Sequence, residues 1–453
     1  MKILIMTTCY PPDTAIAAVR PYMLAKYLKQ SGHEVTVLRS GLIQQSADRT
    51  LPQLEGVRVI TYLGENSPAE CFERENLVFQ TKPTPRNQSR LFFLPETLRK
   101  PLARAYHTIL SPYESFMFLK QFKDGRFLPM QKAIDRLSGE HFDVAFSTVG
   151  DIENIYGGEY AVSVFGCKWI LDFRDPIEGF TPSNFFHPLA KKIQSRSVRK
   201  ADLCTSVSDD LSRRLSLSAG GKQVHTIYNG YDPLVDTLQP SASPEKDVLS
   251  ICYTGSIYAS KQDFSPVLQA LQCLKAQNKI ALSKVRLHYA GNDFSYLYDA
   301  AKKAGVEEVL IDHGYLSRAE AAKIQQTSDL YTVLSWNTSA EKGVLTGKFY
   351  EGIRAGKPIL SIINGNVPHS ELSLLNEKYH YGFCYEICRK KEQFQQLCDY
   401  LENAYREKMS IGTVSYTPDP ALESDFRYDT LAKKLESLCI NLIQESNKCN
   451  GRT

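Results

Sequence analysis

The sequence predicts an α/β protein of two doubly wound domains, each a parallel sheet with crossover helices. Strand-like and helix-like segments alternate along the whole chain, which is typical of parallel sheets. The length of 453 residues is too great for one ordinary core, since a domain averages ~150 residues. One Pro-, Ser- and Asn-containing stretch interrupts the alternation, which then restarts. We expect the two domains to face each other across a cleft, because ligands bind such sheets at the carboxyl ends of the strands.

The first domain is expected at residues 1–230. Its candidate strands are short apolar runs at 2–8, 34–39, 57–62, 143–148, 168–173, 203–207 and 224–228. Residues 17–30 carry apolar side chains at helical spacing, and Gly32 is the glycine that commonly follows a helix.

Residues 231–247 are expected to form the hinge, and residues 248–420 the second domain. The candidate strands of the second domain are 248–254, 285–290, 309–313, 330–334, 358–363 and 383–386. Residues 421–447 are expected to hold a C-terminal helix that packs back on the first domain. Leu and Lys recur there at helical spacing over 424–444, which predicts one long helix.

Composition excludes several classes of protein. The net charge of +4 is too small to indicate wholesale nucleic-acid binding, so no nucleic-acid partner is expected. No apolar run reaches the roughly 18–20 residues of a membrane-spanning helix. The 11 cysteines are scattered, without a CxxC pair or a zinc set, which favours reduced thiols in a cytoplasmic protein. The loop after the first strand lacks the G-x-G-x-x-G fingerprint, which argues against a dinucleotide-binding dehydrogenase.

Charged residues gather at the carboxyl end of the apolar strand at 168–173. Asp172 is its last residue but one, and Arg174 and Asp175 follow it directly. Charges at the carboxyl end of such a strand favour a cleft over a core. The alternative is a structural Asp–Arg pair that caps the next helix.

Two loops of the second half carry weaker signals. Gly255 and Lys261 follow the strand at 248–254, where a glycine allows close approach of a ligand and a lysine suits a phosphate. Asn292 lies in a similar Gly-Asn-Asp loop after the strand at 285–290. Such residues are common at strand ends, so alone they do not identify a site.

The strongest local signal is the segment 343–360. A polar turn at Thr346 and Gly347 opens a helix, a glycine closes it, and an apolar strand follows at once. The helix N-terminus offers backbone amides and a partial positive charge, which together form an anion site. One turn inside, Glu351 is placed to accept hydrogen bonds from two sugar hydroxyls. The alternative is a solvated Glu351 paired with Arg354.

At this point the sequence resembles the retaining glycosyltransferases of family 4, which have the two-domain GT-B fold. The matching segments occur in family order over residues 2–360. They are Tyr10-Pro11-Pro12-Asp13, residues 24–28 and 31–38, residues 172–176, residues 206–208, residues 228–232, and Gly347-Lys348-Phe349-Tyr350-Glu351. The 172–176 segment resembles a branch that acts in bacterial polysaccharide and cell-envelope synthesis.

The resemblance implies a nucleotide-diphosphate sugar donor held by the second domain, with no metal and no further cofactor. Lys261 would bind the diphosphate and Glu351 the ribose, and the backbone near Tyr315 would meet the base. The remaining donor-binding residues implied are Gly255, Ser256, Asn292, Thr346, Gly347 and Lys348. The acceptor, a sugar or a lipid-linked glycan, would lie on the first domain near Arg20 and Arg174, and Asp172 and Asp175 would join Lys261 and Glu351 as catalytic candidates.

Three departures from the family pattern affect these expectations. Ala15-Ile16 replaces the usual Gly-Gly, and Ser256 stands where an arginine often assists the lysine. Gly343 replaces the glutamate that normally contacts the transferred sugar, so the sugar stays open. Either Glu341 substitutes for that glutamate, or the glycine leaves space for a bulkier or deoxy sugar; we favour the open space.

Two other functions are considered beside the transferase. A nucleotide-sugar 2-epimerase would use Asp172, Asp175 and His313 as acid and base groups. A non-catalytic partner of a sugar-transfer complex would explain the losses at Ser256 and Gly343.

Two basic segments suggest peripheral binding to the inner face of the cell membrane. Basic residues outnumber acidic ones over 86–136, which also carries aromatic runs, and a second basic run lies at 191–200. The alternative is a solvated basic face.

Overall fold

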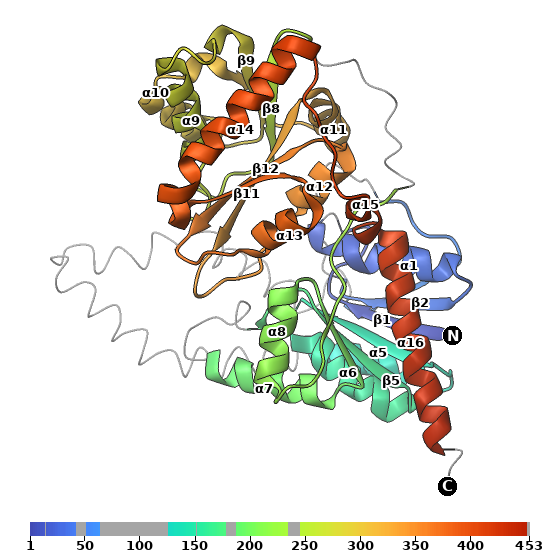
Figure 1. Ribbon diagram of the computed structural model, residues 1–453. Coiled ribbons are helices and arrows are strands. Elements are labelled where there is room, and N and C mark those ends of the chain that lie inside the picture. Colours follow the sequence, from blue (N-terminus) through green and yellow to red (C-terminus); the bar gives the residue numbers. More distant parts are fainter. Residues whose placement is uncertain are drawn as a thin grey trace, which may run out of the picture. The chain divides into compact units, whose positions relative to one another are not determined.

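The computed structural model describes residues 1–13, 15–41, 51–63, 126–150, 152–177, 187–233 and 245–450, with side chains as far as 445. The chain forms two compact units. The first unit comprises Met1–Val207, Leu211–Ile227 and Ala432–Thr453, and the second comprises Ser208–Asp210 and Tyr228–Leu431. Each unit holds one parallel sheet with flanking helices, as the sequence predicts (Figure 1).

The sheet of the first unit has seven strands in the order β3-β2-β1-β4-β5-β6-β7. All neighbouring strands pair in parallel. The strands are β1 Lys2–Thr7, β2 Glu34–Arg39, β3 Arg58–Thr61, β4 Val144–Val149, β5 Lys168–Phe173, β6 Leu203–Ser206 and β7 His225–Thr226. Each coincides with an expected strand to within a few residues. The strand order reverses between β1 and β4, which is the switch point where doubly wound sheets bind ligands.

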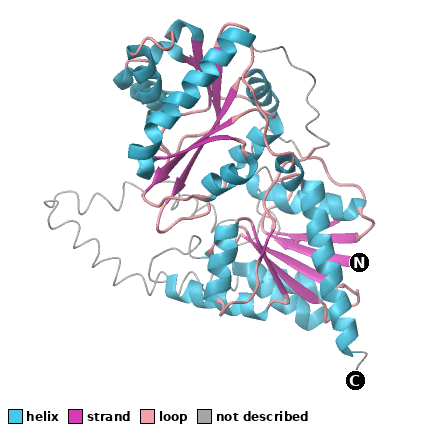
Figure 2. Ribbon diagram, in the orientation of Figure 1, coloured by secondary structure: helices cyan, strands magenta, loops and turns pink. Residues whose placement is uncertain are grey.

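Helices cover this sheet and bury its apolar side chains. They are the 3-10 turn Ile16–Ala18, α1 Val19–Gln30, α5 Leu128–Asp135, α6 Ile152–Phe165, α7 His187–Lys200 and α8 Asp209–Ser218. Helices α5 and α6 pack on a core that contains Met6 and Ala145, while α7 and α8 pack on one around Leu171. Figure 2 shows the helices and strands of each unit as separate layers.

The sheet of the second unit has six strands in the order β10-β9-β8-β11-β12-β13. The strands are β8 Leu249–Thr254, β9 Val285–Ala290, β10 Leu310–Asp312, β11 Leu330–Asn337, β12 Ile359–Gly365 and β13 Gly382–Glu386. Strand β11 extends beyond the expected end at Leu334, because its last residues pair with the equally extended end of β12. Here the switch point lies between β8 and β11.

Side chains of this sheet alternate between two cores, as the pleat of a strand requires. Ile251 and Tyr253 of β8 lie in the core under α9 Ser265–Ala276, α10 Phe294–Ala304 and α14 Lys390–Ile411. Cys252 lies in the opposite core, under α12 Gly347–Ala355 and α13 Glu371–Tyr379. The remaining elements of this unit are α11 Arg318–Thr327, α15 Ala421–Asp425, and the 3-10 turns Leu282–Lys284, Glu307–Val309 and Ile387–Arg389.

The expected single helix over 424–444 is wrong at its start. Helix α15 ends at Asp425, and α16 Tyr428–Asn450 begins three residues later. Between them the Tyr231 amide donates to the Phe426 carbonyl at 3.1 Å, and the Tyr428 amide donates to the Tyr231 carbonyl at 3.0 Å. These hydrogen bonds, together with the complete burial of the Phe426 ring, take the place of helical hydrogen bonds at the break.

Helix α16 then runs along the first unit. Glu436 lies 2.8 Å from His33 Nε2, and Lys434 Nζ donates to the Thr226 carbonyl at 2.8 Å. No helix in the described part of the chain combines the length and apolarity needed to cross a membrane.

Candidate functional site

The loop after β8 begins at Gly255, which has a φ of +124°. A Cβ atom there would lie 2.6 Å from Lys348 Cε, so only glycine lets Lys348 approach this closely. The loop is also held from two sides. Asp293 accepts a hydrogen bond from the Ile257 amide at 2.9 Å, and buried Gln262 donates to the Leu334 carbonyl at 2.9 Å. The backbone that carries Lys261 is therefore fixed.

Lys261 lies at the end of this loop and is engaged by two side chains. Its Nζ donates to both carboxylate oxygens of Glu341, each at 2.7 Å. The same Nζ lies 4.7 Å from the ring centre of Trp336, within the range of a cation–π contact. Asn364 donates to the Lys261 carbonyl at 3.1 Å, which fixes the lysine backbone from the end of β12. Lys261 is thus a held cation at the carboxyl edge of the sheet.

Glu341 pairs with Lys261 and with Trp336, whose Nε1 donates to its Oε2. Burial by itself raises the pKa of Glu341, but the hydrogen bonds from Lys261 and Trp336 outweigh burial and hold that pKa below its ordinary value. The carboxylate is therefore ionised at neutral pH. The structure places Glu341 beside the lysine expected to bind diphosphate.

Glu351, on α12, is held by three donors. Its carboxylate accepts from Lys348 Nζ at 2.9 Å and from Gln325 Nε2 at 2.9 Å, and the Tyr331 hydroxyl lies at 3.3 Å. Arg354, the alternative partner of Glu351, donates to Gln325 Oε1 at 2.9 Å. Glu351 is about one quarter exposed (27%), so its fixed carboxylate still reaches solvent.

The N-terminus of α12 lies four residues before Glu351. The N-cap residue Thr346 is extended, and its side chain makes no hydrogen bond to the helix amides. Gly347, the first helical residue, is exposed and a Cβ there would meet nothing within 4 Å. The first turn of α12 can therefore receive an anion through its backbone amides.

The other expected donor residues lie around this edge with fewer contacts. Ser256 and Asn292 are exposed, at the ends of β8 and β9. Tyr315 is 71% exposed in the loop after β10. His313 stacks on His288, with the two ring nitrogens 2.9 Å apart. Because the Tyr315 ring is exposed, a planar ligand can stack on it.

The first unit holds a buried ion pair at the carboxyl end of β5. Arg20 donates from Nη2 and Nε to Asp172 at 2.7 and 2.9 Å, and the Thr205 and Thr148 hydroxyls complete the shell at 2.7 and 3.1 Å. The Asp172 side chain is fully buried, with 0% exposed. This corrects the expectation that Asp172 itself faces an acceptor, because its carboxylate is enclosed by these donors. The structural Asp–Arg pair exists, with Arg20 as the partner and not the neighbouring Arg174.

Arg174 and Asp175 are more accessible. Arg174 is half-buried and donates to the Ala17 carbonyl at 3.2 Å, and Asp175 is exposed. Both lie at the same sheet edge as the Arg20–Asp172 pair. Of the expected acceptor-side residues, these two reach the surface.

The position of Gly343 corrects the expectation of open space for a sugar substituent. Gly343 has a φ of +67°, and a Cβ there would lie 2.8 Å from Ser208 Oγ and 2.8 Å from Asp210 Cβ. Glu371 Oε2 lies 3.0 Å from the same point. The glycine is therefore required by close packing and by a left-handed backbone conformation.

Several residues of the site had no signal in the sequence. Gln325 is a buried helical glutamine that links Thr254, Glu351 and Arg354. Asn364 and Trp336 come from the ends of β12 and β11. Only the rule that ligands bind at strand ends could have drawn attention to these last two.

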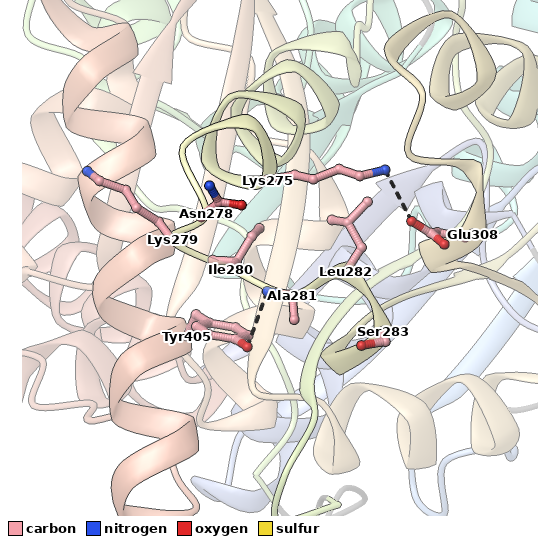
Figure 3. A pocket seen from close by; sticks show the side chains of 9 residues that line it. All are labelled: Lys275, Asn278, Lys279, Ile280, Ala281, Leu282, Ser283, Glu308 and Tyr405. Atoms are coloured by element: carbon pink, nitrogen blue, oxygen red, sulfur yellow. Dashed lines mark hydrogen bonds and ion pairs between the residues drawn. The ribbon is translucent and has the colours of Figure 1, made fainter.

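In the described part of the chain, no group of three or more His, Cys, Asp or Glu residues is arranged to hold a metal ion. A pocket of about 620 Å³ lies elsewhere, between the end of α9 and the amino ends of β9 and β10 (Figure 3). There Lys275 Nζ lies 3.4 Å from Glu308, and the Tyr405 hydroxyl accepts from the Ala281 amide at 3.3 Å. None of the expected site residues lines this pocket.

The basic segments expected at a membrane are described only in part. Residues 86–125 lie outside the described residues. In α7, Arg196 and Lys200 both lie near Glu159, at 3.2 and 3.3 Å, and Arg199 donates to Ser195 Oγ. Lys191 and Lys192 are exposed.

Comparison with known proteins identifies the fold. No family model matches the chain, and no curated protein matches its sequence. Among solved structures, the chain is similar to the lipopolysaccharide outer core galactosyltransferase WaaB, with a TM-score of 0.57 and 13% identity over 99% of this chain and 100% of that one. It is similar to HepE of Anabaena, solved with UDP, with a TM-score of 0.54 and 14% identity over 100% of both chains. It is also similar to a protein of Listeria monocytogenes assigned as a UDP-N-acetylglucosamine 2-epimerase. The TM-score is 0.50 and the identity 12%, over 98% of this chain and 97% of that one. The two-sheet fold is thus that of GT-B glycosyltransferases, and the protein assigned as a 2-epimerase shares it.

Proposed function

We propose that this protein is a glycosyltransferase that moves a sugar from a nucleotide-diphosphate sugar to an acceptor. One observation carries the proposal. Lys261, the open N-terminus of α12 and the fixed carboxylate of Glu351 all lie at the carboxyl edge of the second sheet, beside its switch point. This set offers a cation, amide donors and a hydroxyl-binding carboxylate, which are the groups a nucleotide-diphosphate sugar needs. The similar folds support it, since WaaB is a galactosyltransferase and HepE was solved in complex with UDP.

Each residue of this edge has a role in the proposal. Glu351 accepts hydrogen bonds from the two ribose hydroxyls, and Gln325 and Tyr331 hold its carboxylate in place. The amides of Thr346 and Gly347 bind the diphosphate together with Lys261, and Gly255 lets the chain approach it. Tyr315 lies beside the base. Ser256 and Asn292 line the rim.

Transfer of the sugar leaves a diphosphate whose negative charge must be stabilised. Lys261, Lys348 and the first turn of α12 supply fixed positive charge and oriented amides for it. Because these groups are already in place before reaction, stabilising the leaving group requires little rearrangement. This assigns Lys261 a direct part in the chemical step.

The finer parts of the proposal concern mechanism and acceptor. Following the family 4 resemblance, we propose transfer with retention in bacterial polysaccharide or cell-envelope synthesis. The acceptor is a sugar or lipid-linked glycan bound on the domain 1–230, near Arg174 and Asp175. Asp172 acts there through Arg20, whose guanidinium it orients. The hinge 231–247, the donor domain 248–420 and the C-terminal segment 421–447, which holds α15 and most of α16, complete this organisation.

The proposal is tested by nucleotide binding to Glu351→Gln. The change keeps the side-chain shape and removes the charge that strengthens the hydrogen bonds to ribose. We expect UDP, or the nucleoside diphosphate that most stabilises the wild type in a thermal screen, to bind more weakly by about 1.5–3 kcal/mol. Inorganic pyrophosphate, which lacks ribose, should lose no affinity, because the change removes only the anion that pairs with Lys348. The measurement is isothermal titration calorimetry.

A matched control is Glu392→Gln. Glu392 forms an ion pair with the residue three positions earlier, as Glu351 does, but it is 67% exposed on α14. Its loss should leave nucleotide affinity unchanged. Equal UDP affinity in wild type and Glu351→Gln would refute the assignment of Glu351.

Product analysis separates the three functions. Incubation with a nucleotide sugar and acceptor should give a glycosylated acceptor. Epimerised nucleotide sugar without an acceptor would instead indicate a 2-epimerase, although Asp172 is enclosed by Arg20 and two threonines. Binding without any turnover would indicate a non-catalytic partner.

We also propose a cytoplasmic protein that binds the inner face of the cell membrane through its basic segments. Lys191 and Lys192 of α7 provide exposed positive charge. Glu159 partly neutralises the charges of Arg196 and Lys200 on the same helix. Sedimentation with anionic liposomes should show binding at low salt that is lost at high salt. Absence of binding at low salt would overturn this part.

A further inference from the structure

The ion pair between Lys261 and Glu341 has short contacts, but solvent reaches both side chains, so another anion can replace the carboxylate. Both carboxylate oxygens lie 2.7 Å from Nζ, yet the two side chains are 43% and 45% exposed. Water screens an ion pair with this exposure, so the pair contributes little to stability. A ligand with more negative charge can therefore replace the carboxylate at little cost.

The backbones on both sides of the pair are fixed, so only side chains need to move. The Thr338 amide donates to the Glu341 carbonyl at 2.9 Å, and the Glu341 amide donates to Thr338 Oγ1 at 3.1 Å. Asn364 holds the Lys261 carbonyl. The Trp336 ring under Nζ keeps the lysine in place whether or not Glu341 is bound. The exchange is thus a rotation of the Glu341 side chain.

We propose that Glu341 is a displaceable internal anion, which occupies the diphosphate position at Lys261 until a nucleotide ligand takes its place. This inference rests on the proposed function, because it assigns the diphosphate to Lys261. A diphosphate offers more acceptor oxygens and more negative charge than one carboxylate, so it binds Lys261 in preference to Glu341. An uncharged nucleoside cannot displace Glu341. The pair therefore selects ligands that carry a diphosphate.

The exchange has a consequence for the loop between β11 and α12. Glu341 also accepts from Trp336 Nε1, so its departure removes a hydrogen bond from that ring. The chain contains 2 tryptophans. The other, Trp169, is buried in the first unit, where its Nε1 donates a hydrogen bond to Ser147 Oγ. Trp336 fluorescence is therefore a direct reporter of whether Glu341 is in place.

The test compares wild type with Glu341→Gln, using uridine, UDP and inorganic pyrophosphate as probes. Removing the internal anion should tighten binding of UDP and pyrophosphate roughly two- to fivefold, the range of an exposed ion pair. Uridine should bind equally to both. In the wild type, pyrophosphate should change tryptophan fluorescence, and Trp336→Phe should abolish the change. Thermal unfolding establishes that each variant is folded.

Glu308→Gln is the matched control for net charge, since Glu308 forms an exposed pair with Lys275 in the same unit (Figure 3). It should leave all three affinities unchanged. Unchanged or weaker UDP binding in Glu341→Gln, with normal UDP binding in the wild type, overturns the inference and leaves the proposed function standing. Pyrophosphate displacement of Glu341 in a protein that binds no nucleoside diphosphate supports the exchange and overturns the proposed function. Absence of any pyrophosphate effect on Trp336 overturns the exchange.

Discussion

Replacement of Asp172 by alanine should destabilise the first unit far more than loss of an ordinary ion pair. The Arg20 guanidinium is 3% exposed and would be left buried without its carboxylate, and the Thr148 and Thr205 hydroxyls would lose an acceptor. Breaking a buried pair by removing one partner costs about 3–5 kcal/mol, because the remaining charge is desolvated. We expect that loss in the free energy of unfolding.

The structure provides a control with the same distance and different burial. Arg58 and Glu140 also lie 2.7 Å apart, but their side chains are 54% and 40% exposed. Glu140→Ala should cost at most about 1 kcal/mol, because water screens and replaces that contact. The ratio between the two losses isolates the effect of burial.

Urea unfolding is the assay, followed by the fluorescence of Trp169 in a Trp336→Phe background. Trp169 lies on β5 with Asp172, so it reports on the first unit. A loss below about 1 kcal/mol for Asp172→Ala, equal to that of Glu140→Ala, would refute the reasoning. The double change Arg20→Met with Asp172→Leu should recover much of the stability, since neither side chain of the pair then carries a charge.

Two further predictions concern the second unit. Gly343→Ala should lower the melting temperature, because the added Cβ would lie 2.8 Å from Ser208 Oγ at a φ of +67°, whereas Gly347→Ala, whose Cβ meets nothing within 4 Å, should be neutral or stabilising. Equal melting temperatures would show that the 343 loop adapts. Burial raises the pKa of Glu371 to about 7, despite hydrogen bonds from the Asp209 and Asp210 amides. The folded state then holds a proton that the unfolded state releases near pH 4.5, so stability should fall as pH rises from about 4.5 to 7. Urea unfolding of Glu371→Gln should lack this fall; parallel pH profiles would contradict the assignment.

The strands and the two-domain organisation could be read from the sequence, because they depend on local patterns. Apolar runs of strand length, bounded by polar and turn residues, locate every described strand. Lys261, Thr346, Gly347 and Glu351 are candidates in the sequence because a strand end or a helix start lies next to them in the chain. Local patterns did not predict the break between α15 and α16 at Phe426, because that break depends on hydrogen bonds to Tyr231, which is distant in sequence.

The partners of the site residues were decided only by the tertiary structure. Glu341 lies 80 residues from Lys261, and Arg20 lies 152 residues from Asp172. The strand order places β8 beside β11, so the loops that follow these two strands meet at one sheet edge. Which of the side chains at this edge then pair depends on their burial, their charge and the length of each side chain. The sequence therefore determined which groups are present at the site, and the packing of the sheet determined which of them pair.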